Sequence, residues 1–384
     1  MTPPEIRTTE KSQETVKPWQ AEPTDAPPRT RAPRRARLGA ALMGAAAVAA
    51  SMLTSTSVAA ADPTDTPQVV ERAAGVAEAI ANTTGVGPLE TNAVSAITHG
   101  MLNPLVAPEG VNDWDCVPTA ERPRPIVLVH GTYQNAYSSF SAIGPALQAE
   151  GHCVFALNYG ITSHSLAGII PGVNGTAAVA DGAKELARYV DAVLAQTGAD
   201  QVDLVGYSQG APLARQYLRF EGGADPADPA NNKVKNLVSI AGTNHGTTLN
   251  GIATIGRFMT DHGLNILGLY ELPFGTGPMD QAVGSPFLTN LNAGGDTEPG
   301  IDYTVIASSY DQVSTPYQAS FLEAGPGATV RNIRIQDGCE QDWSDHLSLA
   351  TSPRAIDYVL EALDPESRDG VTPRCAAHAW ITGK

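Results

Sequence analysis

The sequence predicts an α/β fold, with a mostly parallel central sheet that carries helices on both faces. Three observations support this. Short runs of Val, Ile and Leu recur from residue 126 onward, these runs are nearly continuously apolar, and longer stretches with helical spacing separate them. Continuous apolar strands suit a sheet that is covered on both faces. Alternation of strands with helices is typical of a parallel α/β sheet.

Six runs are expected to form the strands: "IVLVHG" (126–131), "CVFALNYG" (153–160), "VDLVGYS" (202–208), "VKNLVSIAG" (234–242), "YTVIASSYD" (303–311) and "TVRNIRI" (329–335). Between the second and third runs, apolar residues keep one helical face from Ala183 to Leu194. A last helix is expected to begin with Ser352 as its cap and Pro353 as its first residue. Its inward side chains would be Ile356, Val359, Leu360 and Leu363.

Two segments depart from this alternation. Residues 69–81 predict one amphipathic helix, and the rest of 62–113 is interpreted as an extended arm over the main domain. Residues 244–296 hold no clear strand. Within them, Leu249, Ile252, Ile255 and Met259 have the spacing of an apolar helix stripe. That stripe is either packed on the sheet or part of a lid over an apolar pocket, and the sequence leaves both open.

The first 61 residues are interpreted as an export signal. A basic stretch, "RAPRRARLG", precedes an apolar run at 38–53, and small residues follow at Ala59 and Ala61. The alternative is a membrane anchor, but this run of 16 residues is shorter than the roughly 20 that a spanning helix needs. The Arg34-Arg35 pair leaves twin-arginine export open. The expected organisation is a leader (1–61) cleaved before Asp62, an arm (62–113) and a main domain (114–384) of a secreted protein.

Charge narrows the range of partners. The chain has 24 Lys and Arg against 40 Asp and Glu, a net charge of −16. The leader holds 8 of the basic and 5 of the acidic residues, so the mature chain would carry −19. A surface this acidic repels phosphate backbones, which excludes nucleic acid as an expected partner.

Four cysteines follow the expected cleavage point, and an even number in an exported protein predicts two disulfides. Of the three possible pairings we expect Cys116–Cys153 and Cys339–Cys375, because each joins neighbours in the chain around an expected strand. Four buried free thiols are the alternative. A zinc site is not expected, because no C-x-x-C spacing occurs.

The clearest chemical signal is "GYSQG" at 206–210, a G-x-S-x-G pattern between an expected strand and an expected helix. The turn is so tight that the positions two before and two after Ser208 crowd each other, and glycine at both relieves this. The hydroxyl would then stand above the sheet at a helix N-terminus, which favours developing negative charge. Ser208 is therefore the candidate nucleophile.

A serine hydroxyl needs a base to take its proton, usually a histidine. In α/β proteins that carry such a G-x-S-x-G turn, the catalytic residues follow one another along the chain as serine, acid and histidine. His346 follows the last expected strand, and Asp311 follows the one before it. Asp302 is a weaker candidate for the acid than Asp311, because Asp302 precedes the expected strand. Asp342 and Asp345 are interpreted as solvent-exposed or loop-capping residues.

The same chemistry requires two N–H donors for an oxyanion. We expect the backbone N–H of Gln209, directly after the serine, and that of Thr132, in the loop after the first strand. His130 is interpreted as a buried residue that shapes this loop and not as a base.

Together these segments resemble the class 2 lipases, secreted bacterial lipases and esterases of the α/β-hydrolase superfamily. The resemblance covers residues 114–365 and rests on "PIVLVHGT", "CVFALNYG", "VDLVGYSQG", "SIAGTNHGTT", "YTVIASSYDQVSTPY" and "DHLSLATSP". It implies the α/β-hydrolase fold, a catalytic triad of Ser208, Asp311 and His346, oxyanion donors at Thr132 and Gln209, and the same two disulfides. Tyr207 stands where many such lipases have His, and Ala211 where many have Gly.

The expected function is hydrolysis of carboxylic esters, most of all long-chain lipid esters, by a monomer that contacts a lipid interface. No cofactor or metal is expected. A short-chain or polyester esterase, an acyltransferase and a non-catalytic binding protein are the alternatives.

Overall fold

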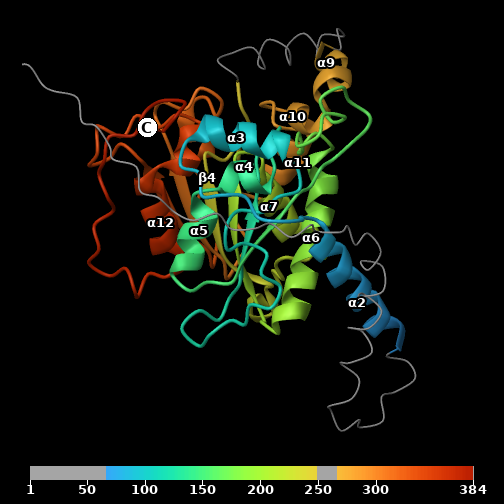
Figure 1. Ribbon diagram of the computed structural model, residues 1–384. Coiled ribbons are helices and arrows are strands. Elements are labelled where there is room, and N and C mark those ends of the chain that lie inside the picture. Colours follow the sequence, from blue (N-terminus) through green and yellow to red (C-terminus); the bar gives the residue numbers. More distant parts are fainter. Residues whose placement is uncertain (1–65, 249–265, 384) are drawn as a thin grey trace, which may run out of the picture. The chain divides into compact units, whose positions relative to one another are not determined.

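The computed structural model describes residues 66–248 and 266–383, all within one compact unit that spans Asp62–Lys384. Six parallel strands form one sheet in the order β2-β1-β3-β4-β5-β6 (Figure 1). They are β1 (Ile126–Val129), β2 (Val154–Leu157), β3 (Val202–Tyr207), β4 (Val234–Ile240), β5 (Asp302–Ala307) and β6 (Thr329–Arg334). All six were expected from the apolar runs, and the predicted fold class is confirmed.

The register of the sheet decides where its loops meet. Val129, the last residue of β1, pairs with Leu157 of β2 and Gly206 of β3. Because all strands are parallel, every loop that follows a strand leaves the same edge of the sheet. Ser208, Asp311 and His346 all follow strands, so the fold carries them to this edge.

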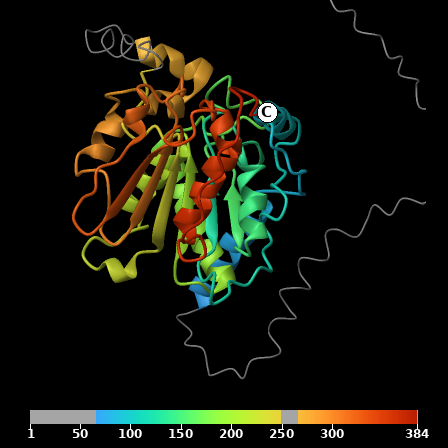
Figure 2. The same cartoon turned by 90° about the vertical axis from the view of Figure 1, so that its left-hand side faces the viewer.

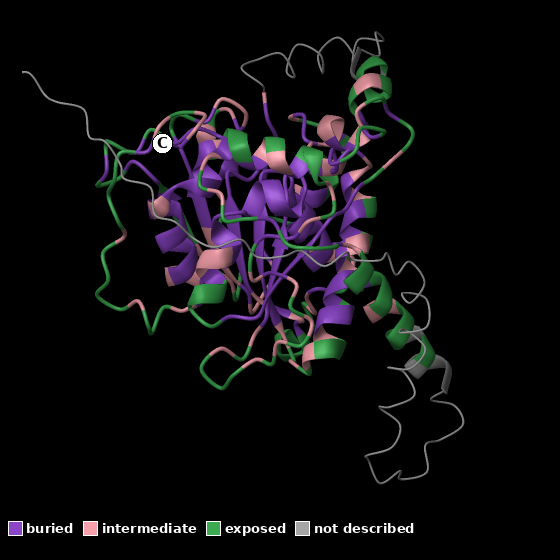
Figure 3. Cartoon of the chain, viewed as in Figure 1, coloured by how far each residue is buried: buried purple, intermediate pink, exposed green. Residues whose placement is uncertain are grey.

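Side chains of β1 alternate between two cores. Ile126 and Leu128 belong to a buried cluster with helices α4 (Ala136–Phe140), α5 (Ile143–Ala149) and α12 (Pro353–Leu363). Val127 and Val129 belong to a second cluster with α6 (Val179–Thr197) and α7 (Gly210–Phe220). Figure 2 shows α12, in red, across the first face of the sheet, and Figure 3 shows the strands buried between the helices. Ser352 caps α12 and Pro353 begins it, as predicted.

The described part of the arm contains two helices where the sequence predicted one. α2 (Thr66–Ala81) lies along α6, and α3 (Ala93–Leu102) packs on α4. The expectation of an extended chain was wrong over α3, whose first turn is capped by the Asn92 side chain. Two more asparagines of the arm cover the edge strand β2: Asn112 bonds both backbone groups of Ala156, and Asn82 bonds those of Asn158.

Between β4 and β5, the described residues form three helices: α9 (Ile266–Phe274), α10 (Thr276–Asp280) and α11 (Pro286–Asn292). Short 3₁₀ turns complete the fold, namely η1 (Pro229–Asn231), η2 (Tyr317–Ser320) and η3 (Ser348–Thr351). The expected stripe at 249–259 and the expected leader lie outside the described residues. In the part of the chain that is described, no helix combines the length and the apolar character needed to cross a membrane.

Two disulfides join Cys116 to Cys153 and Cys339 to Cys375. These are the pairs that the sequence favoured. The first fastens the segment just after the arm to the residue before β2, and the second fastens the loop after β6 to the C-terminal tail.

Candidate active site

Ser208 lies in a sharp turn between β3 and α7, with a positive φ of 54°. A Cβ atom on Gly206 would lie 2.6 Å from the Gly210 carbonyl oxygen, which matches the expected crowding. On Gly210 it would instead lie 2.0 Å from the carbonyl oxygen of Val129 in the neighbouring strand. Glycine is therefore required at both positions, but for two different contacts.

The structure brings the three expected side chains together. The Ser208 Oγ lies 2.9 Å from Nε2 of His346, and Nδ1 of the same ring lies 2.8 Å from Oδ2 of Asp311. All three residues are buried to more than nine-tenths. A hydroxyl, an imidazole and a carboxylate in this sequence form the arrangement in which a serine is activated as a nucleophile.

The second oxygen of the Asp311 carboxylate is also fixed. Oδ1 accepts hydrogen bonds from the backbone N–H groups of Val313 (2.8 Å) and Ser314 (2.7 Å). The Ser314 hydroxyl in turn donates to the carbonyl of Ala241, after β4. The carboxylate is thus held by its own loop and presents Oδ2 to His346.

The loop that carries His346 is held by the end of β3 and by the loop after β5. The Tyr207 hydroxyl donates to the His346 carbonyl over 2.7 Å, and burial raises the pKa of this phenol well above its usual value, which keeps the donor protonated. Gln312, next to Asp311, donates to Asp345 over 3.0 Å and receives the His346 N–H at 3.4 Å. Tyr207 therefore orients the base through its backbone, a role that the sequence did not indicate.

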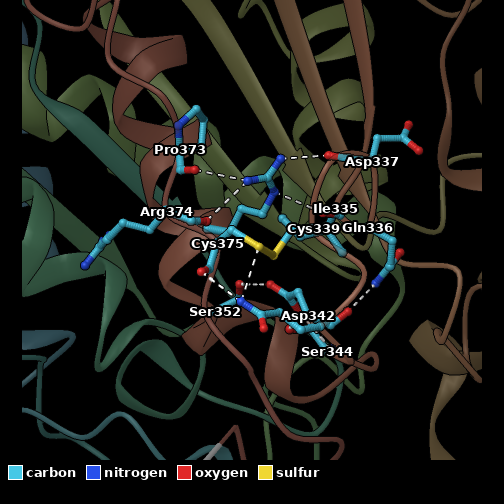
Figure 4. Close-up of a disulfide and its surroundings, with 12 residues drawn as sticks. Ile335, Gln336, Asp337, Cys339, Asp342, Ser344, Ser352, Pro373, Arg374 and Cys375 are labelled. Carbon is cyan, nitrogen blue, oxygen red and sulfur yellow. Dashed lines mark hydrogen bonds between the residues drawn. A yellow bond between two sulfur atoms is a disulfide. The ribbon is translucent and has the colours of Figure 1, made fainter.

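Asp342 and Asp345 are buried, so the solvent-exposed interpretation was wrong and the loop-capping one is correct. Asp345 accepts from the N–H and the hydroxyl of Ser348. Asp342 accepts from the Ser344 N–H and from the Ser352 hydroxyl (Figure 4). Serines placed close by in the chain supply the donors that allow these carboxylates to be buried.

The C-terminal tail closes the same loop from outside. Figure 4 shows the Cys339–Cys375 disulfide beside Asp342 and Ser352. Next to it, the Trp343 N–H donates to the His378 carbonyl, and Gln341 donates to the carbonyl of Cys375.

The two expected oxyanion donors are the backbone N–H groups of Thr132 and Gln209, and neither donates to another group of the described chain. Gly131, beside Thr132, lies against Ser208: a Cβ there would come within 3.1 Å of the serine Cβ. Both N–H groups therefore belong to the loops that border the nucleophile.

Gln281 holds the first of these loops, and the sequence did not single it out. Its Nε2 donates to the Thr132 hydroxyl over 2.8 Å, and its Oε1 accepts from the Thr243 hydroxyl at 2.9 Å. Gln281 follows α10, far from both partners in the chain, so no local pattern marks it.

His130 is fully buried and stacks on Tyr159 with the ring centroids 4.1 Å apart. Its Nε2 faces the Tyr159 N–H at 3.2 Å, so its proton sits on Nδ1 and is donated to the Gly131 carbonyl. Burial lowers the pKa of His130 to about 4. The ring is thus a neutral part of the loop, as interpreted from the sequence.

Among residues 66–248 and 266–383, no three His, Cys, Asp or Glu side chains converge on a possible metal site.

A family model described as "Lipase (class 2)" matches residues 123–341, which include Ser208 and Asp311 and end five residues before His346. No curated protein matches the chain. Among solved structures, lipase B of Aspergillus fumigatus is similar with a TM-score of 0.50 and 18% identity, covering 67% of this chain and 55% of that one. The mature form of the Bacillus licheniformis lipase BlEst2 is similar with a TM-score of 0.38 and 16% identity, covering 64% of this chain and 94% of that one.

Proposed function

The chain belongs to the class 2 lipase family, and from this we propose that it is a serine hydrolase of carboxylic esters. The single observation that carries the proposal is the continuous contact from Ser208 through His346 to Asp311. The two N–H groups beside the serine, on Thr132 and Gln209, complete the set that ester hydrolysis requires.

In the first half of the reaction, Ser208 Oγ attacks the ester carbonyl carbon while its proton passes to Nε2 of His346. The carbonyl oxygen becomes an oxyanion that accepts hydrogen bonds from the N–H groups of Thr132 and Gln209. When this intermediate collapses, the bond to the alcohol oxygen breaks and the His346 proton passes to the leaving group. The products of this half are a free alcohol and an acyl group on Ser208.

In the second half, water takes the place of the alcohol. His346 Nε2 accepts a proton from the water as its oxygen attacks the acyl carbonyl. The second oxyanion collapses, the bond to Ser208 Oγ breaks, and His346 returns the proton to Oγ. Asp311 stays ionised throughout and stabilises the imidazolium that forms in each half.

The description of the family as lipases supports long-chain lipid esters as the substrates of this chain. A short-chain or polyester esterase, or an acyltransferase, would use the same triad with another acyl or acceptor group. A non-catalytic binding protein is disfavoured, because all three positions of the triad are filled and in contact. Two disulfides favour an oxidising location, which supports secretion of the chain.

The test is an initial-rate profile of the purified protein on p-nitrophenyl esters from acetate to palmitate, beside Ser208→Ala. Rates that rise toward long chains and vanish in the variant would support a lipase. Activity confined to short chains would keep the triad and identify a general esterase. Wild-type rates in Ser208→Ala would refute the proposal.

A further inference from the structure

The segment after β4 packs against the loop that carries Asp311. We name residues 241–248 the β4 segment and residues 311–321 the acid loop. Asn244 of the β4 segment donates its side-chain amide to the Ser320 carbonyl of the acid loop over 2.7 Å. Further hydrogen bonds between the two are donated by Ser314, Thr247 and Thr248. The position of Asp311 therefore depends on the β4 segment.

His245 extends this contact to a third segment. Its backbone N–H donates to the Ala319 carbonyl over 3.0 Å, and its ring Nδ1 lies 3.1 Å from the same oxygen. Its ring Nε2 lies 3.0 Å from Oδ1 of Asp296, in the loop between α11 and β5. Because a carbonyl and a carboxylate accept hydrogen bonds and do not donate them, both ring nitrogens have to donate. A histidine ring that donates from both nitrogens carries a positive charge.

The charges around the ring favour this protonated form. Among the described residues, two charged groups face the ring: the Asp296 carboxylate and, from α7, the Arg215 guanidinium. The hydrogen bond to Asp296 raises the pKa of His245 above its usual value, although partial burial and Arg215 act in the opposite direction. Burial alone would raise the pKa of Asp296, but the hydrogen bonds from His245 and from the Glu323 N–H lower it below its usual value. The two side chains therefore form an ion pair.

The Asp296 end of this pair is fixed to α7. Arg215 is buried, and its guanidinium donates to the Asp296 carbonyl over 3.0 Å and to the Asn244 carbonyl over 3.2 Å. The Glu323 N–H donates to Oδ2 of Asp296 over 2.8 Å. The charged ring of His245 thus links the acid loop to the helix that follows Ser208.

We propose that His245 is a positioning residue whose charged ring holds the acid loop so that Asp311 meets His346, and which loosens this loop when it loses its proton. The proposal rests on the proposed function, because it concerns how the triad is held together. His245 acts through the acid loop, and its proton takes no part in the reaction. The pKa of this ring is higher in the folded protein than in the unfolded chain. The stabilisation is therefore complete below about pH 6.5 and is lost as the pH rises through the folded pKa.

The test compares the wild-type protein with His245→Gln from about pH 6 to about pH 10. A glutamine amide places a donor at one of the two acceptors only, so it resembles the neutral ring at every pH. We expect kcat on p-nitrophenyl acetate to be about five- to tenfold lower in the variant at about pH 6.5, because a misplaced catalytic group reduces turnover. As the pH rises, the wild-type kcat should fall until the two rates agree within about twofold. The matched control is His164→Gln, at an exposed histidine in the loop after β2, which should follow the wild type throughout.

NMR titration of the histidine rings measures the charge of His245 directly. Its signal is assigned by its loss in His245→Gln. We expect a higher pKa for His245 than for the exposed His164, and we expect the fall in wild-type kcat to occur at the pKa of His245. If His245→Gln does not fold, assignment of the wild-type ring through its backbone signals gives the same comparison.

Two results would overturn the proposal: a pKa of His245 no higher than that of His164, or a ratio of wild-type to variant kcat that is the same at every pH. The second would leave His245 with a structural role alone. A wild-type protein that hydrolyses no ester at any pH would instead refute the proposed function. The pKa of His245, together with urea unfolding that loses stability toward high pH in the wild type and not in the variant, would then decide whether the ring holds the acid loop.

Discussion

Replacing Asp311 with asparagine should abolish most of the activity without unfolding the protein. Oδ1 of Asp311 accepts two backbone N–H groups, and Oδ2 accepts Nδ1–H of His346. An asparagine has one oxygen and one NH₂ group. Two backbone donors outweigh one ring donor, so the amide oxygen takes the place of Oδ1 and the NH₂ group faces the ring.

The imidazole must then accept at Nδ1, which moves its proton to Nε2. In this tautomer Nε2 donates to Ser208 Oγ and has no lone pair for the serine proton. Because this tautomer cannot act as the general base, kcat should fall about 10⁴-fold, which equals roughly 5.5 kcal/mol of lost transition-state stabilisation. The backbone bonds to Oδ1 survive, so the free energy of unfolding should fall by only about 1–2 kcal/mol.

The assay is kcat on a p-nitrophenyl ester together with urea unfolding. Asp302→Asn is the matched control, because Asp302 begins β5, the strand that Asp311 follows, and pairs with Lys235 at the surface. It should keep activity within about twofold. Activity of Asp311→Asn within tenfold of wild type would refute the assignment of Asp311 as the partner of His346.

Three further predictions concern stability. Gly210→Ala should lower the free energy of unfolding by more than about 3 kcal/mol in urea, because its Cβ would clash with the Val129 carbonyl. The control is Gly75→Ala in α2, where a Cβ meets open space, so this change should be neutral or stabilising. The pKa of His130 is about 4 in the folded protein, so between pH 6.5 and 4 the unfolded chain binds a proton there that the folded protein does not. His130 should therefore lower the free energy of unfolding by about 3 kcal/mol between pH 6.5 and 4, and the His130→Gln variant should lack this part of the loss. Equal pH dependence of stability in the wild type and the variant would contradict this. Removing the Cys339–Cys375 link, which closes a separation of 36 residues, should cost roughly 3–4 kcal/mol, and a loss below about 1 kcal/mol in urea would contradict the chain-entropy argument.

The sheet and the meeting of Ser208, Asp311 and His346 were predictable because their signals are local or follow chain order. An apolar run marks each strand, and the two glycines around Ser208 mark the turn. Asp311 and His346 could be found because each follows a late strand of a parallel sheet, whose loops share one edge.

Contacts between distant segments could not be read in the same way. Gln281 reaches Thr132 across 149 positions, and Tyr207 reaches His346 across 139. The sequence around each of these residues does not indicate its partner, because only the folded chain brings the two residues of a pair together. The burial of Asp342 was missed for another reason. Acidic side chains are usually exposed, but the neighbouring serines, already visible in "DWSDHLSLATS", supply the donors that bury this one.

The positive φ of Ser208 has a consequence for protein engineering. Side chains other than glycine occupy this region of backbone space at a cost of about 1–3 kcal/mol. Glycine would relieve that cost but would remove the hydroxyl that we propose as the nucleophile. A selection for thermal stability alone would therefore reward loss of Ser208, and directed evolution of this protein has to screen turnover and melting temperature together.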